Sequence, residues 1–402
     1  MILLQINVVN NVYSTGRIAE EIGQLALTNG WKSYIAWGRE TKPSQSQLIR
    51  IGSKWDIYRH VILTRLFDRH GFGSTRATKK LLKQIEIIQP DIIHLHNLPG
   101  YYINVEILFN YLAQSKIPVV WTLHDCWAFT GHCAHFESLG CKEWQTMCRN
   151  NCPQRESYPK SFVSQAKKNF LQKKQLFNQV KHMTLVPVSH WLENLVKQSY
   201  LNKYPCQVIH NGINMREFAP QPNVSEVRKK LNLTDKFVIM GVTMIWSESK
   251  GLNDFITLSQ MLPVDCQIVL VGLHQAQIDQ LPSTIVGIKH TQNIQQLAEL
   301  YSMADVFVNP TYADTYPTTH LEAMACGTPV ITYQTGGCGE SVSKETGLVV
   351  EKGDLTALHQ AIQTVKSKGK AFYSAACRER ALRHFDKEKC YQKYIDLYNK
   401  LI

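Results

Sequence analysis

Two carboxylates eight residues apart are the most informative feature of this 402-residue sequence. Asp314 follows the apolar run DVFVNP at 305–310, and Glu322 lies within a helix expected to begin near Thr318. A loop carboxylate and a helix carboxylate placed in this way can both accept hydrogen bonds from adjacent sugar hydroxyls. Acids at this spacing are common, so the spacing alone fits equally well a turn residue and a solvated helix residue.

The first turn of the same helix provides groups that suit a phosphate. Thr318 and Thr319 stand where free backbone N–H groups and the positive end of the helix dipole favour an anion. After the following strand, Gly336 and Gly337 allow the backbone to approach a ligand closely, because glycine has no Cβ. Together these residues predict a site for a sugar and a phosphate.

The segment 314–340, DTYPTTHLEAMACGTPVITYQTGGCGE, resembles the E-(seven residues)-E signature of the retaining GT-B glycosyltransferases of the bacterial group 1 type, known as family 4. Asp314 replaces the first Glu of the family pattern, which keeps the charge but draws the carboxylate back by one methylene. The resemblance implies that Asp314 binds hydroxyls of the donor sugar with altered specificity and that Glu322 holds the nucleotide ribose. Tyr316, which replaces the Phe of a Phe-Gly pair, is expected among the donor-binding residues.

The segment GVTMIWSESKGLNDF at 241–255 matches part of the family's diphosphate-binding loop. Lys250-Gly251 corresponds to the end of that pattern, and a Lys at a loop–helix junction is a suitable point charge for a phosphate. The Arg that accompanies it in the family is absent between Gly241 and Gly251, and no serine reproduces a bidentate guanidinium. Either another cation completes the clamp, with Arg17 as the candidate, or donor affinity or activity is weakened.

Further candidates follow strands of the first half. The resemblance implies that the loop containing Gly16 and Arg17 faces the donor phosphates and the acceptor. His124 follows the apolar run PVVWTL at 118–123, where family members keep a His near the donor's anomeric carbon. This His is expected to hydrogen-bond the sugar or to stabilise developing positive charge, although a lone His is more often structural. Three polar residues that end the preceding strand are candidates for the acceptor pocket: His94, His96 and Asn97.

The chain has eleven cysteines, five of which lie between 126 and 152. The last four of these could form a tetrahedral structural zinc site: Cys133, Cys141, Cys148 and Cys152. Their spacing is wider than that of familiar zinc modules, so free thiols or two disulfides remain open. No Asp-x-Asp metal motif occurs, so cationic side chains and a helix dipole would do the work of a divalent ion. We therefore expect catalysis to need no cofactor besides the nucleotide-diphosphate sugar, with a UDP-sugar favoured by family frequency.

The elements that carry these residues form two series of short apolar strands alternating with helical segments. The expected strands span 2–9, 31–37, 91–95, 118–123 and 182–188 in the first series, and 237–242, 267–272, 283–288, 305–310, 329–333 and 347–350 in the second. A helix is expected from Arg17 to Thr28. Such alternation predicts parallel sheets covered on both faces, with site residues just after the carboxyl ends of the strands.

A chain of 402 residues is too long for a single hydrophobic core, so two domains are expected. The family resemblance implies the GT-B architecture, an α/β fold of two facing Rossmann-like doubly wound domains with an inter-domain cleft. We expect an acceptor-side domain at 1–213 and a nucleotide-sugar-binding domain at 214–385. A C-terminal helix at 386–402 is expected to return to the first domain.

The net charge of +12 lies entirely in the first half of the chain. Residues 1–215 hold 25 Lys and Arg against 13 Asp and Glu, whereas residues 216–402 hold 19 of each. Basic stretches at 54–83 and 157–192 interleave cations with apolar residues, a pattern that suits an anionic membrane surface. The same pattern fits helices whose apolar residues face the core, and charge alone would also fit nucleic acid. No apolar run approaches the roughly 18 residues of a spanning helix.

The N-terminal segment MILLQINVVN has no basic region and no cleavage site, so we expect a first strand rather than a signal peptide. This suggests a cytoplasmic enzyme, peripheral at the inner face of the bacterial cytoplasmic membrane. The strings STGRIAEEIG and WTLHDCWAFTGHC resemble transferases of capsule and lipopolysaccharide biosynthesis. The hypothesis is a retaining hexosyltransferase acting from a nucleotide sugar onto a lipid-linked oligosaccharide. Alternatives are a nucleotide-sugar epimerase, a phosphorylase, or a non-catalytic protein that binds membranes or nucleic acid.

Overall fold

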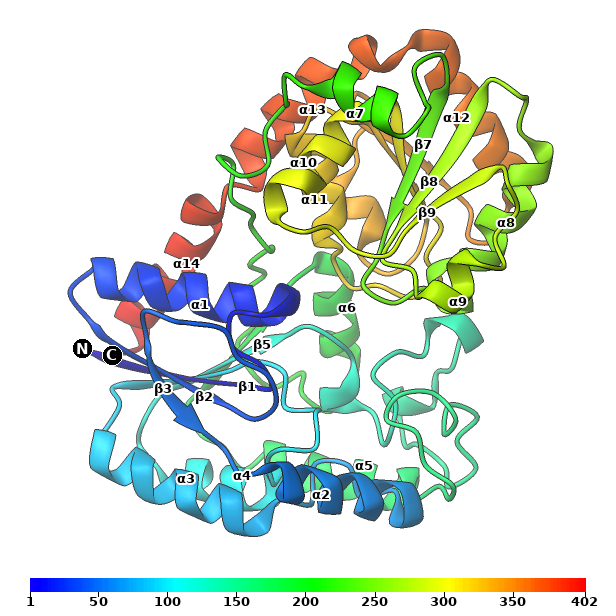
Figure 1. Ribbon diagram of the computed structural model, residues 1–402. Coiled ribbons are helices and arrows are strands. Elements are labelled where there is room, and N and C mark those ends of the chain that lie inside the picture. Colours follow the sequence, from blue (N-terminus) through cyan, green and yellow to red (C-terminus); the bar gives the residue numbers. More distant parts are fainter. The chain divides into compact units, whose positions relative to one another are not determined.

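The computed structural model describes residues 1–402, which divide into two compact units (Figure 1). The N-terminal unit comprises Met1–His210 and Tyr391–Ile402, and the C-terminal unit comprises Asn211–Cys390. The second boundary falls inside the last helix, α14 (Lys387–Leu401). None of the helices combines the length and the apolar composition that a bilayer-spanning segment needs.

A six-stranded parallel sheet forms the centre of the N-terminal unit, in the order β3-β2-β1-β4-β5-β6. Its strands are β1 (Ile2–Asn7), β2 (Lys32–Trp37), β3 (Gln47–Arg50), β4 (Ile92–Leu95), β5 (Val119–Leu123) and β6 (Met183–Pro187). The central strands are buried on both faces, as near-continuous apolar runs predict. Strand β3 was not predicted, because this short edge strand is largely exposed and has no apolar run.

Helices cover both faces of this sheet. They are α1 (Tyr13–Thr28), α2 (Lys54–Phe67), α3 (Thr75–Ile88), α4 (Val105–Gln114), α5 (Ala166–Phe177) and α6 (His190–Gln198). Figure 1 shows α1 on one face and α2, α3 and α5 on the other. Helix α14 is held to the sheet by hydrogen bonds, with the Tyr398 hydroxyl 2.6 Å from His94 Nδ1 and the Tyr394 hydroxyl 3.0 Å from Thr122 Oγ1.

The C-terminal unit contains a second six-stranded parallel sheet, in the order β12-β11-β10-β7-β8-β9. Its strands are β7 (Phe237–Val242), β8 (Cys266–Val271), β9 (Ile285–Ile288), β10 (Val306–Asn309), β11 (Val330–Tyr333) and β12 (Gly347–Val350). Each strand lies on a predicted apolar run. The two parallel sheets with flanking helices confirm the predicted α/β, doubly wound architecture.

Two groups of helices flank the second sheet. The helices of this unit are α7 (Val224–Lys230), α8 (Leu252–Met261), α9 (Gln275–Ile278), α10 (Ile294–Met303), α11 (Thr318–Ala325), α12 (Leu355–Lys368) and α13 (Lys370–His384). Helices α8 and α12 pack together on one side, and α10, α11 and α13 pack together on the other (Figure 1). Helix α11, which carries the second carboxylate of the motif, therefore belongs to a packed layer.

Each sheet has one point at which the chain changes the direction of strand addition. In the first sheet β1 lies beside β4, and in the second β7 lies beside β10. In open α/β sheets, ligands bind beyond the carboxyl ends of the strands at such a switch point. The loops after these four strands are therefore where functional side chains are expected.

Candidate active site

Lys250 and Asp314 meet at the switch point of the second sheet. Lys250 ends a short 3-10 helix, η4 (Glu248–Lys250), in the loop after β7, and Asp314 lies in the loop after β10. The Lys250 Nζ donates to Asp314 Oδ2 at 2.9 Å and to the Ala313 carbonyl at 3.0 Å. The two side chains are 30% and 23% exposed, so the ion pair is only partly shielded from solvent. The two residues predicted to bind the donor are thus direct partners of each other.

Backbone contacts hold these two loops together. The amide of Tyr312 donates to the Ser249 carbonyl at 2.9 Å, and Thr311 Oγ1 donates to the same oxygen at 3.2 Å. Gly251 adopts a φ of +75°, and a Cβ there would lie 2.3 Å from the Pro310 carbonyl oxygen. Glycine is therefore required for the approach that places Lys250 beside the β10 loop.

Gly336 and Gly337, after β11, were predicted to let the backbone approach a ligand closely. In the structure they approach the loop that contains Asp314. Gly336 has a φ of +54°, and a Cβ at this position would lie 1.7 Å from the Asp314 carbonyl oxygen. The Gly337 amide donates to the same oxygen at 3.3 Å. The turn after β11 and the loop after β7 both contact the loop after β10. These three loops together determine where the Asp314 carboxylate lies.

Helix α11 begins directly after this loop. Thr318 and Thr319, partly exposed, form its first turn, where backbone N–H groups have no partner inside the helix. Tyr316 is buried at 3% exposure, and burial raises the pKa of its hydroxyl. The structure brings these three residues together with Asp314 on one continuous segment, while their contacts with a donor stay predictions.

Glu322 is buried rather than solvated. Its exposure is 3%, and its Oε2 accepts a hydrogen bond of 2.9 Å from the Tyr301 hydroxyl of α10. This geometry excludes the alternative of a solvated helix residue. A buried carboxylate held by a hydroxyl has a defined orientation, which is what ribose recognition requires. The ribose contact itself stays a prediction.

His320, which the sequence analysis did not single out, anchors the start of α11. Its Nε2 lies 2.8 Å from Asn309 Nδ2 at the end of β10, and its Nδ1 lies 3.0 Å from Ser341 Oγ. The amide group donates to Nε2, so the ring is neutral and donates through Nδ1. Burial lowers the pKa of His320 to about 4, which keeps the ring in this form at neutral pH. A lone His inside a helix carries no sequence signal for such a role.

The first loop of the N-terminal unit is shorter than predicted, because α1 begins at Tyr13 rather than Arg17. Gly16 and Arg17 therefore lie in the first turns of a helix. The Gly16 carbonyl accepts a hydrogen bond from the Asn11 amide at 3.1 Å, and a Cβ at Gly16 would come within 3.0 Å of Val9. These residues follow β1 at the switch point of the first sheet, and their contacts with a diphosphate stay predictions.

His94, a candidate for the acceptor pocket, is instead part of the interior. Its exposure is 0%, and its Nε2 lies 2.7 Å from Thr122 Oγ1 while its Nδ1 is bonded to the Tyr398 hydroxyl. Both ring nitrogens are used to hold β5 and α14. His96, two residues further along, has its ring centroid 3.9 Å from that of His94, so the two lie on the same face and differ in how far along the strand they stand.

His124 is half-buried at the end of β5, beside His96. The two rings stack with centroids 5.8 Å apart, and His124 Nε2 lies 3.5 Å from His96 Nδ1. Both residues, with Asn97 and Asp125, line a small pocket beyond the strand ends. Burial lowers the pKa of His124 to about 4, so the ring is neutral at pH 7. A neutral imidazole suits the predicted place beside developing positive charge, because it does not repel that charge.

The cysteine-rich segment does not form the predicted zinc site. No group of three or more His, Cys, Asp or Glu side chains is arranged to hold a metal ion, and none of the eleven cysteines forms a disulfide. Cys133 and Cys152 hydrogen-bond to each other, while Cys148 Sγ accepts from the Gly131 amide at 3.3 Å. Burial raises the pKa of Cys148 to about 12, whereas the hydrogen bond between Cys133 and Cys152 raises the pKa of Cys133 and lowers that of Cys152 to about 7. Because no ligand set converges, a zinc site is not supported for Cys133, Cys141, Cys148 and Cys152.

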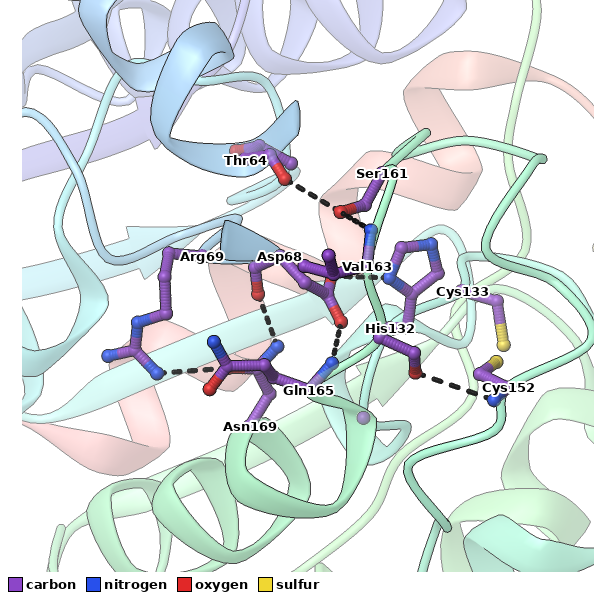
Figure 2. A network of polar contacts seen from close by, with 12 residues as sticks. Thr64, Asp68, Arg69, His132, Cys133, Cys152, Ser161, Val163, Gln165 and Asn169 are labelled. Carbon is purple, nitrogen blue, oxygen red and sulfur yellow. Dashed lines mark hydrogen bonds and ion pairs between the residues drawn. The ribbon is translucent and has the colours of Figure 1, made fainter. Parts of the chain in front are cut away.

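A buried polar network, rather than a metal, anchors this segment (Figure 2). The His132 Nδ1 lies 2.6 Å from Asp68 Oδ1, and both side chains have no exposed surface. The second oxygen of Asp68 accepts from the Gln165 amide at 2.7 Å, and Asn169 Nδ2 donates to the Asp68 carbonyl at 2.5 Å. The segment is thereby tied to the end of α2 and the start of α5.

Two family models match the chain. Residues 19–217 match the model described as Glycosyltransferase Family 4, and residues 235–367 match the model described as Glycosyl transferases group 1. The two matches together cover most of the chain, and the second includes the Lys250 and Asp314 loops.

Curated proteins and solved structures are similar over long stretches. A putative colanic acid biosynthesis glycosyl transferase, WcaC of Escherichia coli K12, is 24% identical, with 100% of each chain covered. An N,N'-diacetylbacillosaminyl-diphospho-undecaprenol alpha-1,3-N-acetylgalactosaminyltransferase of Campylobacter jejuni is 29% identical over 49% of this chain and 54% of its own length. HepE of Anabaena in complex with UDP-glucose has the same fold, with a TM-score of 0.69 at 14% identity over 100% of both chains.

Proposed function

We propose that this chain, which belongs to the group 1 type of family 4 glycosyltransferases, transfers a hexosyl unit from a nucleotide-diphosphate sugar to a lipid-linked oligosaccharide. The reaction serves surface-polysaccharide biosynthesis and retains the configuration at the anomeric carbon. The observation that carries this proposal is the Lys250–Asp314 pair at the switch point of the second sheet, directly before the first turn of α11.

The C-terminal unit binds the donor in this proposal. An ammonium has three N–H donors, so Lys250 can contact the diphosphate and Asp314 together. The backbone N–H groups at Thr318 and Thr319 donate hydrogen bonds to the same diphosphate at the positive end of α11. Asp314 accepts hydrogen bonds from sugar hydroxyls, and Glu322, oriented by Tyr301, accepts them from the ribose.

The chemical step exchanges one bond for another at the anomeric carbon. The bond from this carbon to the β-phosphate oxygen breaks, and a bond to the acceptor hydroxyl oxygen forms on the same face of the sugar. The acceptor proton passes to an oxygen of the departing diphosphate, which serves as the base. Lys250 and the start of α11 stabilise the negative charge that develops on the diphosphate, and neutral His124 contacts the reacting sugar.

The similar proteins support the choice of donor and acceptor. The HepE structure contains UDP-glucose, which supports a UDP-sugar as the donor. The name of the Campylobacter jejuni relative specifies a diphospho-undecaprenol acceptor, which supports a lipid-linked substrate. We assign the acceptor side to the basic N-terminal unit, working at the inner face of the cytoplasmic membrane.

A donor-hydrolysis assay on three single variants tests the proposal. Lys250→Ala, Asp314→Ala and Glu322→Ala should each lower turnover by about tenfold or more, because each removes a charged hydrogen-bonding group worth roughly 1.5–3 kcal/mol. Lys289→Ala, at an exposed position after β9, is the matched control and should retain full turnover. Unchanged turnover in all three variants would overturn the assignment.

A further inference from the structure

Helix α2 exposes a stripe of apolar side chains to solvent and buries two polar side chains, while its other apolar residues, Ile57, Val61 and Leu63, are partly buried. Exposed apolar residues recur at spacings of three and four, in a single stripe along the helix: Trp55 (76% exposed), Tyr58 (60%), Ile62 (56%) and Leu66 (48%). The opposite side of the helix buries His60 and Thr64, at 1% and 0% exposure. A surface helix of a globular protein shows the reverse arrangement.

The two buried polar side chains of α2 are hydrogen-bonded, and the bonds of His60 to residues outside the helix fix the orientation of α2. His60 Nε2 accepts hydrogen bonds from the amides of Gly71 and Gly73 at 3.0 and 3.2 Å, and its Nδ1 lies 3.0 Å from Ser74 Oγ. Thr64 Oγ1 donates to the His60 carbonyl at 2.9 Å. Rotating α2 to bury its apolar stripe would break the bonds that His60 makes outside the helix.

A second set of bonds fixes the C-terminal end of α2 (Figure 2). Ser161 Oγ donates to the Thr64 carbonyl at 2.9 Å, and Asp68, which follows the helix, is bonded to His132 and to the Gln165 amide. These contacts join α2 to the cysteine-rich segment that follows His124. A partner that binds α2 is thus held against a well-anchored part of the unit.

Further exposed apolar residues lie at the C-terminal end of α2. Phe67 is 53% exposed, and Phe162 and Val163 are 62% and 42% exposed. The Phe162 amide donates to the Arg65 carbonyl at 2.9 Å, which places this segment against the end of α2. We call the seven exposed residues the α2 patch: Trp55, Tyr58, Ile62, Leu66, Phe67, Phe162 and Val163.

Cations accompany the α2 patch, and the helix itself offers no unengaged acid to balance them. Arg59 lies within the stripe, and Lys54 and Arg65 flank it. The one acid of the helix, Asp56, accepts from the Ser53 amide and hydroxyl in a capping box, and these bonds lower the pKa of Asp56. Lys80 of α3 interacts electrostatically with the same carboxylate, so a further cation lies beside the start of α2.

The helix of the second basic stretch, α5, has no comparable surface. In α5 the apolar residues Phe170, Leu176 and Phe177 are buried, and so is Lys173, whose Nζ donates to the Trp127 carbonyl at 2.5 Å. These three apolar residues face the core, as the alternative interpretation of this pattern expected, and Leu171 alone of the large apolar residues of α5 is exposed, at 46%. The structure separates the two stretches, and of the two helices α2 and α5 it is α2 that has its apolar stripe in solvent.

We propose that the α2 patch inserts its aromatic and aliphatic side chains into the interfacial region of an anionic lipid bilayer. Tyr and Trp rings favour the level of the headgroups, and Lys and Arg near the surface are attracted to anionic lipids. Docking would hold the N-terminal unit where a lipid-linked acceptor resides, and in that respect the inference rests on the proposed function. The charge of the patch argues against a second copy of this chain as its partner, because two copies would oppose like charges.

Vesicle co-sedimentation tests this inference without any glycosyl transfer. The full chain should bind vesicles of phosphatidylcholine containing phosphatidylglycerol at about a third of the lipid, and binding should weaken in high salt. The double variant Trp55→Ser/Ile62→Ser should bind at least about tenfold more weakly, because it removes two inserted apolar side chains. The matched control Val264→Ser/Phe372→Ser, which changes exposed apolar residues of the C-terminal unit, should bind as the original chain does.

Three further readouts make every outcome decisive. Circular dichroism and the unfolding midpoint check that the double variant Trp55→Ser/Ile62→Ser (the α2 variant) is folded. If the double variant does not fold, the single variant Arg59→Gln is tested in its place. Equal vesicle binding by the α2 variant and its control would overturn the inference. A concentration-dependent dimer that disappears in the α2 variant would also overturn it, in favour of self-association. Donor hydrolysis should be the same in the α2 variant as in the original chain, because α2 lies outside the proposed donor site. If the original chain hydrolysed no donor, that result would count against the proposed function but would not change the vesicle-binding result.

Discussion

The Lys250 ammonium and the Asp314 carboxylate lie 2.9 Å apart, although 64 residues separate them in the chain. The contact exists because β7 and β10 are neighbours in the sheet and because Gly251 allows their loops to touch. A cation and an anion that belong to one pair can recognise different parts of one ligand. Their individual contributions can therefore be separated by choice of ligand.

Lys250→Ala should weaken the binding of UDP and of UDP-sugar by similar factors, about tenfold to a hundredfold, because the ammonium contacts the diphosphate that both contain. Asp314→Asn should weaken UDP-sugar binding but change UDP binding less than about threefold, because its carboxylate contacts the sugar. Isothermal titration calorimetry of both ligands measures the difference, with Lys289→Ala as the control. Equal loss of UDP affinity in both variants would contradict the assignment of Asp314 to the sugar.

Gly336→Ala should destabilise the C-terminal unit and lower donor affinity, since its Cβ would overlap the Asp314 carbonyl oxygen at 1.7 Å. Gly140→Ala is a matched control, because Gly140 is also left-handed, with a φ of +59°, but a Cβ there would meet no atom within 4 Å. The control should lose only the roughly 1–2 kcal/mol of left-handed backbone strain and keep its donor affinity. Urea unfolding and ligand titration of both variants make the comparison. Equal effects at the two glycines would show that the approach to Asp314 is unimportant.

His60 should make the N-terminal unit sensitive to acid. Burial lowers the pKa of His60 to about 4, below the value of about 6.5 expected in the unfolded chain, so the unfolded chain binds more protons between these values. Stability is therefore fully present well above pH 6.5 and is lost as the pH falls towards 4, by about 1 to 2 kcal/mol at a pH near 5.5. The hydrogen-exchange protection of the segment containing the Gly71 and Gly73 amides, relative to the intrinsic exchange rate at each pH, should fall over this range.

The variant His60→Gln isolates this contribution. Its unfolding midpoint should depend less on pH between about 6.5 and 5 than that of the original chain, while His290→Gln, at an exposed position, should keep the original dependence. A pH dependence that is identical in all three proteins would show that His60 does not account for the acid sensitivity.

The cysteine-rich segment should be stable without metal. Because no three ligands converge in this segment, the purified protein should contain no stoichiometric zinc. Elemental analysis and the unfolding midpoint with and without EDTA measure this directly. One zinc per chain, together with a lower midpoint in EDTA, would mean that the thiols rearrange around an ion.

Short apolar runs bounded by polar turns carried enough information to predict most strands of both sheets, because buried parallel strands have few other compositions. Strand β3 was not predicted, because its sequence QLIR forms a largely exposed edge strand without an apolar run. The order of the strands was not predicted; the family resemblance implied only two Rossmann-like doubly wound domains. The contact between Lys250 and Asp314 depends on that order, so residue spacing alone could not predict it.

Side-chain orientation was the least predictable property. His94, His96 and His124 lie at the ends of two adjacent strands, yet His94 is part of the interior whereas His96 and the half-buried His124, which stand further beyond the strand ends, line the pocket. The pattern of α2 fitted both a core-facing and a solvent-facing stripe. The choice depends on polar partners such as Gly71 and Gly73 for His60, which lie beyond the helix itself.

A transfer assay tests whether this chain is a retaining, metal-independent hexosyltransferase. The protein is incubated in EDTA with a panel of labelled UDP-, GDP- and dTDP-sugars and a lipid-linked oligosaccharide, and the product is analysed by NMR at the anomeric carbon. We predict labelled lipid-linked product, formed from a UDP-sugar, with the anomeric configuration of the donor. Product of inverted configuration, a requirement for added metal, or conversion of the donor to an isomeric free nucleotide sugar would contradict the account.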